Sequence, residues 1–260
     1  MKILITAILL LPICIHGQTM EKNTSPSRWK QDISIDGKLD EWKKSDFSYN
    51  EETRLWYSLA NDDVYLYLAV KKNENFNKVF NWGGLQFLVS KLDKKDNESK
   101  SSIAFPLAVK DDRRVPHDQL TRIAVEGFQD IPEMELNLFN EYGIQVGWTL
   151  EKDDIVEYAD PTYRYELAIP LAHLKTFLEA NEIKFNILLR GSREFRPSPQ
   201  DLALIQNMEV LMQEKLIQTL KSKTPGASME VINKHIAGIK DVGRWTEFSS
   251  TYRLATNPDS

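Results

Sequence analysis

The stretch Ile33-Ser34-Ile35-Asp36-Gly37-Lys38-Leu39-Asp40-Glu41-Trp42 decides the fold that we expect for this chain. Its two isoleucines alternate with Ser34, which is the pattern of a half-buried strand. The Asp-Gly pair predicts a turn, because Gly accepts a positive φ and Asp hydrogen-bonds its own downstream backbone. A single helical turn after it would place Leu39 and Trp42 on one buried face. The stretch therefore predicts the first corner of a β-sandwich.

A hairpin follows, and it is the clearest in the sequence. Two alternating segments, Leu55 to Ala60 and Val64 to Val70, flank the turn Asn61-Asp62-Asp63. One face of this hairpin is mostly aliphatic and predicts core. The other face carries Trp56 and two tyrosines. We expect that aromatic face to meet either solvent or a ligand.

The rest of the chain predicts a mainly β protein. Further alternating segments lie at 85–90, 103–109, 122–128, 135–139, 144–150, 163–169, 183–190 and 245–254. Pro106 would make 103–109 an edge strand, since proline cannot donate to a ladder. From residue 198 to about 240 the apolar period becomes helical, with one helix at 199–223 and a second after it. Many short strands without alternating helices predict an antiparallel sandwich of jelly-roll or immunoglobulin-like type, with a helical insertion before the last strand.

The amino-terminal residues have the layout of a secretory signal. A lysine precedes an apolar run from Ile3 to Ile15, and His16-Gly17-Gln18 then turns polar. We expect a signal peptide over 1–18, a flexible leader over 19–29 and one domain over 30–260. The protein would then be secreted or periplasmic. A lipoprotein is not expected, because the residue before Cys14 is isoleucine and not a small residue.

Composition excludes several classes of protein. The chain has 38 acidic against 33 basic side chains, a net charge of −5, which argues against a nucleic-acid partner. No apolar stretch after the signal approaches the length of a membrane span. Its one cysteine lies in the signal, so we expect neither disulfides nor thiolate chemistry in the mature protein.

The order of motifs resembles the family 9 carbohydrate-binding modules, part of a wider group of DOMON-like sandwiches. The similarity rests on Ile35 to Trp42, the hairpin Leu55 to Val70, Gly84 to Val89, Glu166-Leu167-Ala168-Ile169-Pro170, and Phe185 to Arg190. It covers about residues 30 to 196 and the closing strand. It implies an exported sandwich without catalytic activity, which binds the end of a polysaccharide or an oligosaccharide between aromatic side chains. The helical insertion departs from the family's compact module.

Three tryptophans are candidate ligand-binding residues, because flat aromatic faces stack on the apolar faces of sugar rings. They are Trp82, Trp56 and Trp148. The alternative for each is a large core or rim residue, and it is favoured for Trp148, which shares a face with Ile144 and Val146. The helix at 199–223 is a candidate contact for a protein partner. In that alternative the insertion covers the binding cleft and the protein is an interaction module.

The sequence offers candidate ligands for two cofactors, calcium and haem. Asp36, Asp40 and Glu41 crowd carboxylates around one bend and are candidate calcium ligands. The alternative reading is a turn residue, a helix cap and a solvated charge. Haem, which some DOMON-like domains bind, would need ligands among His117, His173, His235 and Met134. No hydrolase or phosphate-binding motif appears, so an enzyme is not expected.

Overall fold

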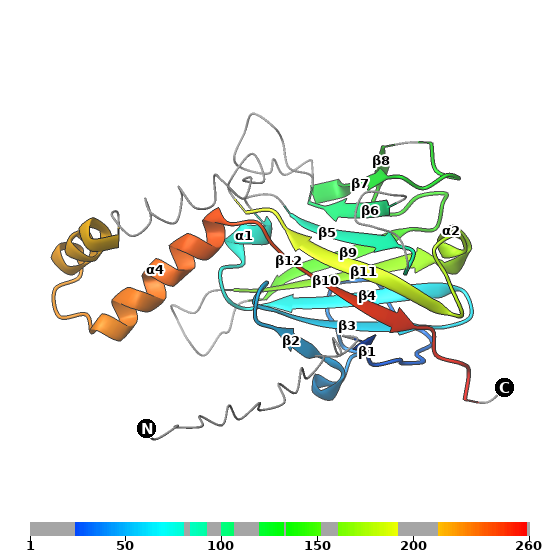
Figure 1. Cartoon of the computed structure of the whole chain (residues 1–260), viewed down its shortest axis with the longest axis horizontal. Coiled ribbons are helices and arrows are strands. Elements are labelled where there is room, and N and C mark those ends of the chain that lie inside the picture. The colour runs from blue at the N-terminus through cyan, green and yellow to red at the C-terminus, as the bar shows by residue number, and fades with distance from the viewer. Residues whose placement is uncertain are drawn as a thin grey trace, which may run out of the picture.

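The computed structural model describes residues 24–80, 84–92, 100–106, 120–132, 134–151, 161–191 and 213–258. Two sheets, antiparallel but for one strand pair, form a β-sandwich (Figure 1). The strands are β1 (Thr24–Ser25), β2 (Ser48–Asn50), β3 (Leu55–Asn61), β4 (Tyr65–Lys72), β5 (Leu85–Ser90), β6 (Lys100–Phe105), β7 (Arg122–Glu126), β8 (Glu135–Asn137), β9 (Gln145–Glu151), β10 (Thr162–Pro170), β11 (Glu182–Leu189) and β12 (Thr246–Arg253). The helices are the 3₁₀ turn η1 (Lys44–Asp46), α1 (Asn77–Phe80), α2 (Leu171–Leu174) and α4 (Met229–Gly243).

The two sheets differ in size. One has the order β2-β3-β4-β10-β9, and the other has the order β1-β12-β11-β5-β6-β7-β8. All pairs are antiparallel except β1, which runs parallel to β12. The predicted fold class, a mainly β antiparallel sandwich with helices before the last strand, is confirmed.

The core lies between the inner faces of the two sheets. Alternate residues of β10 point inward, and the side chains of Tyr163, Tyr165 and Leu167 are fully buried. Phe87 and Phe185 pack from the larger sheet, with ring centroids 5.8 Å apart. Full burial of one large apolar side chain contributes about 1.5–3 kcal/mol. Hydrophobic contact between the layers therefore holds the sandwich together.

Three local predictions were wrong. Ile33 to Ile35 is not a strand; this segment lies flat on the outer face of the five-stranded sheet, and the amides that follow it donate to a side chain. The leader is shorter than expected, because Ser25 in β1 is buried and hydrogen-bonded to Ser250. β6 is not an edge strand, since it lies between β5 and β7, and Pro106 follows its last residue.

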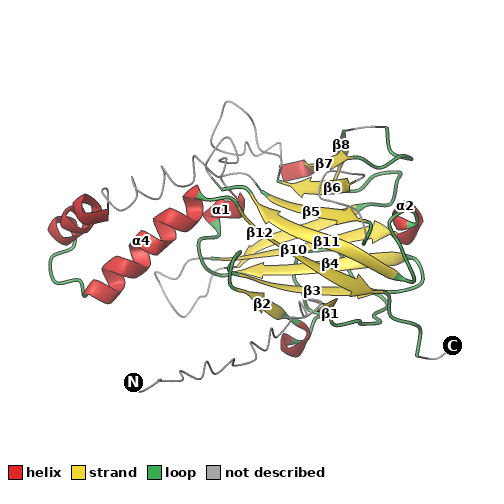
Figure 2. Ribbon diagram, viewed as in Figure 1, coloured by secondary structure: helices red, strands yellow, loops and turns green. Residues whose placement is uncertain are grey.

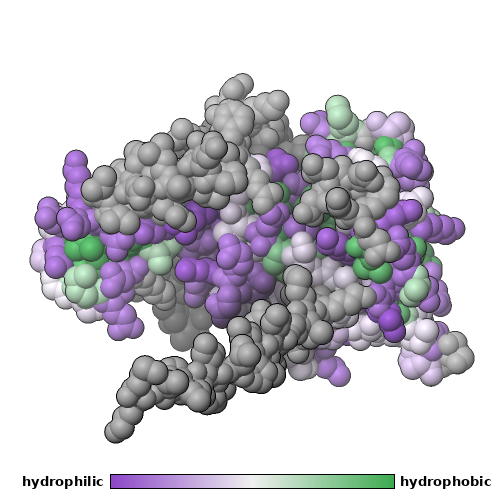
Figure 3. Space-filling model, in the orientation of Figure 1, coloured by the Kyte–Doolittle hydropathy of each residue, from purple (hydrophilic) through white to green (hydrophobic). Residues whose placement is uncertain are grey.

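The helices before β12 extend beyond one end of the sandwich (Figure 2). Residues 213–223 and α4 form this projection, and the carboxyl end of α4 meets the sandwich beside α1. In the view of Figure 3 the projection shows a few hydrophobic residues among hydrophilic ones, and the exposed hydrophobic residues of α4 include Met229 and Val231. In the view of Figure 1 residues 213–223 and most of α4 lie beyond the end of the sheets, and residues 199–212 of the predicted partner helix lie outside the described residues. Within the described part of the chain, no helix is both long and apolar enough to cross a membrane.

A buried ion pair joins α4 to the sandwich. Lys78, on α1, donates to Asp241 Oδ1 at 2.8 Å and to Thr246 Oγ1 at 2.7 Å. Asn75 donates to the second oxygen of Asp241 at 3.0 Å. Because Lys78 is wholly buried and Asp241 nearly so, these bonds compensate for the desolvation of both charges. They fix where α4 ends and β12 begins.

A second buried lysine lies beside this pair. Lys72 donates to the backbone carbonyls of Thr53 and Arg54 at 3.0 and 3.2 Å, and its ammonium is 3.8 Å from Asp241. Burial lowers the pKa of Lys72 to about 8, although the nearby Asp241 opposes this effect. The folded protein therefore releases this proton at a lower pH than the unfolded chain does.

We predict that stability rises with pH between about 8 and 10.5 on account of Lys72. In this window the unfolded chain binds more protons than the folded one at this position, so raising the pH favours folding. Relative to a Lys72→Met variant, the wild-type protein should gain up to about 3 kcal/mol in free energy of unfolding between pH 7 and pH 10.5. Urea unfolding across this range measures the difference, with the exposed-site variant Lys221→Met as the control. If the free energy of unfolding changed with pH in the same way in wild type and in Lys72→Met, the lowered pKa of Lys72 would be contradicted.

Candidate functional site

A buried carboxylate organises the outer face of the five-stranded sheet. Glu166, on β10, is fully buried, and its Oε2 accepts from the amides of Asp36 and Gly37 at 3.2 and 2.8 Å. Its Oε1 accepts from the indole Nε1 of Trp42 at 3.0 Å. One side chain thus satisfies three donors from the stretch 36–42 and holds that stretch across the sheet.

Two glycines allow the backbones to approach at this crossing. A Cβ on Gly37 would lie 2.5 Å from the backbone of Trp148, and one on Gly147 would lie 2.6 Å from the Ile35 carbonyl oxygen. Gly37 also has a φ of +78°, which other residues rarely adopt. The segment can therefore lie directly on β9 only because both positions lack a side chain.

Apolar contacts complete the attachment. Ile35, Leu39 and Trp42 form a small second core on the outer face. They cover the small or flat residues Ala60, Tyr67, Ala69 and Ala168 of β3, β4 and β10. The expected burial of Leu39 and Trp42 on one side is confirmed, and the Trp42 amide donates to the Leu39 carbonyl.

The environment of Glu166 raises its pKa to about 6. Burial is the larger cause, and the hydrogen bonds from Gly37 and Trp42 act in the opposite direction. A raised carboxyl pKa can mark a catalytic acid. Here both oxygens are engaged by donors of the attached segment, so we assign Glu166 a structural role.

The part of the outer face that this segment leaves open carries a transverse row of side chains. The strand register places Tyr49 opposite Trp56, Trp56 opposite Lys71, and Lys71 opposite Arg164. Trp56 is half-buried, and its ring lies 5.0 Å from that of Tyr49 at a tilt of 48°. The row therefore passes from two aromatic rings to two cations.

This row forms one wall of a groove with a volume of about 470 Å³. The residues that line the groove are Lys38, Leu39, Asp40, Trp42, Lys44, Phe47, Trp56, Lys71, Asn73 and Arg164. They come from the attached segment and the η1 turn after it on one side, and from β3, β10 and the end of β4 on the other. The groove thus combines aromatic surface with four cationic side chains.

Some of these charges are already paired. Arg164 forms an ion pair with Glu151 and donates to the Lys38 carbonyl at 2.8 Å. Lys38 forms an exposed ion pair with Asp36 at 2.8 Å. Among the residues that the structure describes, no carboxylate forms an ion pair with Lys44 or Lys71. These two ammonium groups are the ones available to a ligand.

The three predicted tryptophans do not form one site. Trp56 lines the groove. Trp148 points to the opposite face of the same sheet, where its ring contacts Phe80 and Phe105, so the core alternative applies to it. Trp82 lies outside the described residues. This position agrees with the core alternative that the sequence favours for Trp148.

The structure does not bring the proposed calcium ligands together. Asp36 accepts from the amide and ammonium of Lys38, and these bonds hold the pKa of Asp36 below its ordinary value. Glu41 accepts from the amide of Ser34 at 3.2 Å, and Asp40 faces the groove. Within the described ranges, no group of three or more acidic or histidine side chains is arranged to hold a metal ion.

The haem candidates are also dispersed. Both ring nitrogens of His173, on α2, face acceptors, the Asp130 carboxylate at 2.5 Å and the Tyr142 carbonyl at 2.8 Å. His235 is exposed on α4, and Met134 is 74% exposed beside β8. His117 lies outside the described residues.

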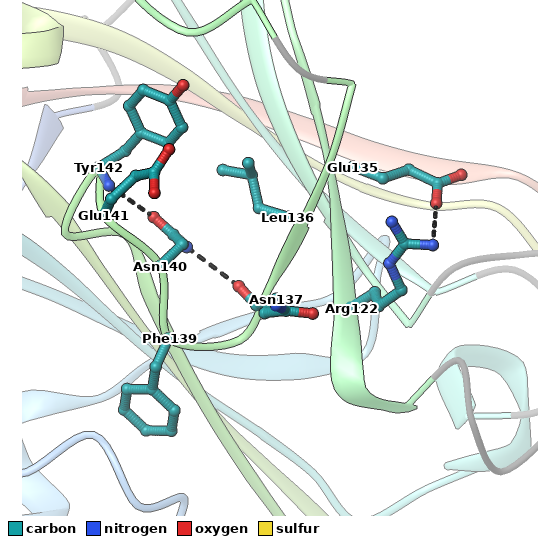
Figure 4. Close-up of a pocket in the computed structure, with 8 residues that line it drawn as sticks. All are labelled: Arg122, Glu135, Leu136, Asn137, Phe139, Asn140, Glu141 and Tyr142. Carbon is teal, nitrogen blue, oxygen red and sulfur yellow. Dashed lines mark hydrogen bonds and ion pairs between the residues drawn. The ribbon is translucent and has the colours of Figure 1, made fainter.

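A second hollow lies at the β7–β8 edge of the larger sheet (Figure 4). Its volume is about 540 Å³, and some of its polar side chains are engaged by neighbours. Arg122 pairs with Glu135 at 2.8 Å, and Asn140 donates to two backbone carbonyls of its own turn. Figure 4 shows the exposed ring of Phe139 pointing away from the other labelled side chains. We therefore take the groove beside Trp56 as the candidate site.

We predict that Glu166→Leu lowers the free energy of unfolding by about 3 kcal/mol or more. Two buried donors and one partly buried donor would lose their acceptor, and each unsatisfied buried donor costs about 1–3 kcal/mol. The control Glu41→Leu removes one exposed bond and should cost less than about 1 kcal/mol. Urea unfolding followed by tryptophan fluorescence measures both variants. If both variants lost the same small amount of unfolding free energy, Glu166 would not hold the segment on the sheet.

No protein family and no curated protein matches the sequence. Among solved structures, the chain is similar to a family 9 carbohydrate-binding module from Caldicellulosiruptor kristjanssonii in complex with glucose, at 13% identity over 64% of this chain and 78% of that chain, with a TM-score of 0.34. It is also similar to a family 9 module from the same organism in complex with cellotriose, at 12% identity over 63% and 75%, with a TM-score of 0.33. These structures belong to the family that the sequence motifs resemble, but at this distance the similarity carries no argument about the ligand.

Proposed function

We propose that this protein binds carbohydrate, without chemical conversion, in the groove on the outer face of the five-stranded sheet. The observation that carries the proposal is the half-buried Trp56 in the groove wall, supported by Tyr49 and surrounded by polar side chains. An indole held in place offers a flat apolar surface at little entropic cost. That is the surface a pyranose ring needs for stacking.

The rim of the groove supplies the other half of sugar recognition. Asn73 and Asp40 are exposed and can exchange hydrogen bonds with hydroxyl groups. Lys44 and Lys71 can donate to hydroxyl, ether or anionic oxygens. A largely preformed hollow with an aromatic wall and a few polar groups is the usual design of a small-ligand site. The groove therefore fits a short stretch or an end of a glycan.

The groove supports binding better than catalysis. Hydrolysis of a glycoside generally needs two carboxylates on opposite sides of the scissile bond. Among the lining residues that the structure describes, Asp40 is the one carboxylate. Glu166, below the attached segment, already uses both of its oxygens.

Export is part of the same proposal. The apolar run at 3–15, with a lysine before it, supports a cleaved signal peptide and a secreted or periplasmic location. A glycan-binding protein in either location would meet polysaccharide directly. Detection of a mature chain that begins near residue 18, by mass spectrometry of the exported fraction, would test this point.

We predict that Trp56→Ala weakens glycan binding about thirtyfold or more. Loss of a central aromatic anchor costs about 2 kcal/mol or more in binding free energy. Affinity electrophoresis on a panel of neutral and acidic polysaccharides, followed by calorimetry with an oligosaccharide of the retained polymer, measures the change. The control Phe139→Ala removes an exposed ring at the second hollow and should leave binding unchanged. Binding lost in Phe139→Ala and kept in Trp56→Ala would place the site at the second hollow.

A further inference from the structure

We infer that the groove selects glycans that carry negative charge, through a uronate carboxylate or a sulfate ester placed against Lys71 and Lys44. This inference rests on the proposed function and names its ligand class. It comes from the charges around the groove and from their position relative to Trp56.

The groove is basic although the chain is acidic. Four of its lining residues are cationic and one is acidic, whereas the whole chain has a net charge of −5. Lys38 and Arg164 already have carboxylate partners, in Asp36 and Glu151. Lys44 and Lys71 form no ion pair with a carboxylate among the described residues, so the groove keeps a net positive charge even with Asp40 counted. They give the groove a field of the opposite sign to that of the protein as a whole.

The strand register places two positive charges opposite each other, and an anionic ligand would offset their repulsion. Lys71 lies directly opposite Arg164 on the neighbouring strand, and like charges in this arrangement destabilise a sheet. Glu151 pairs with Arg164 and not with Lys71. An anion beside Lys71 would offset this repulsion, so binding and stability should be linked.

The same register sets the distance between the stacking surface of Trp56 and the ammonium group of Lys71. Lys71 is directly opposite Trp56 on the other neighbouring strand. Residues in such positions have Cβ atoms about 4.5–5.5 Å apart. A sugar ring stacked on Trp56 therefore lies within reach of the Lys71 ammonium, and a charged substituent on that ring can accept from it. Charge-assisted hydrogen bonds of this kind are about twice as strong as neutral ones.

The test compares ligands that differ only in charge. Calorimetry would measure binding of oligogalacturonides and of the same oligosaccharides after reduction of their carboxyl groups, with a sulfated oligosaccharide of similar length as a third ligand. We expect at least one charged ligand to bind about tenfold or more tightly than the neutral counterpart at low salt, and its affinity to fall as salt rises. A preference for oligogalacturonide identifies carboxylate as the recognised group, and a preference for the sulfated ligand identifies sulfate.

Variants then locate the effect. Lys71→Gln should weaken the charged ligand about tenfold and the neutral one by clearly less, because a neutral hydroxyl forms the weaker hydrogen bond with Lys71. Lys44→Gln should act in the same direction. Lys221→Gln, on the helical projection, is the matched control and should change neither. Thermal denaturation of each variant shows that the fold is retained. The charged ligand should also raise the melting temperature of wild type more than that of Lys71→Gln.

The contrary results distinguish a failure of the charge preference from a failure of carbohydrate binding itself. Equal affinity for charged and neutral ligands, both lost in Trp56→Ala, would overturn the charge preference and keep carbohydrate binding. Tight binding of the charged ligand that Lys71→Gln and Lys44→Gln leave intact would also overturn the charge preference at this groove. Binding of charged ligand that Trp56→Ala does not weaken, or no binding of any oligosaccharide, would overturn the proposed function itself.

Discussion

The hydrogen bonds to Glu166 are the constraint on which the outer face depends. A buried carboxylate without donors would be costly, and so would the Asp36 and Gly37 amides without an acceptor. Each side therefore requires the other, and the segment from Ile35 to Trp42 has one favourable position on the sheet. Because that segment covers only part of β3, β4 and β10, its edge becomes one wall of the groove and the uncovered strands become the other.

The two faces of the five-stranded sheet thus have different roles, one in the core and one in holding the segment and forming the groove. The inner face contributes to the core, and Trp148 belongs to it. The outer face carries three alanines and the buried ring of Tyr67 where the segment lies, and Trp56 with the cations of the groove where it does not. Ala69 and Gly147 flank Glu166, one row of residues away from Trp56 and Lys71. The attachment and the proposed binding surface are therefore neighbouring rows of the same strands.

The sequence predicted the architecture better than the site. Alternation in the hairpin from Leu55 to Val70 identified an aromatic outer face, because residue parity along a strand decides which side is buried. Ile33 to Ile35 was mistaken for a strand, since the same alternation suits a segment that lies flat on a sheet. The row from Trp56 to Lys71 and Arg164 could not be predicted, because it depends on the register between strands far apart in the chain. Gly147 was missed for the same reason: only the partner backbone reveals why it lacks a side chain.

The most direct measurement of the central claim is hydrogen exchange at the donors to Glu166, followed by nuclear magnetic resonance. The account predicts that the amides of Asp36 and Gly37 and the indole N–H of Trp42 exchange as slowly as the central amides of β10, because they open only when the sandwich unfolds. Exchange at the rate of an exposed loop, in a protein whose β10 amides remain protected, would contradict it. The segment would then not be fixed to the sheet, and the groove that it borders would not be a preformed site.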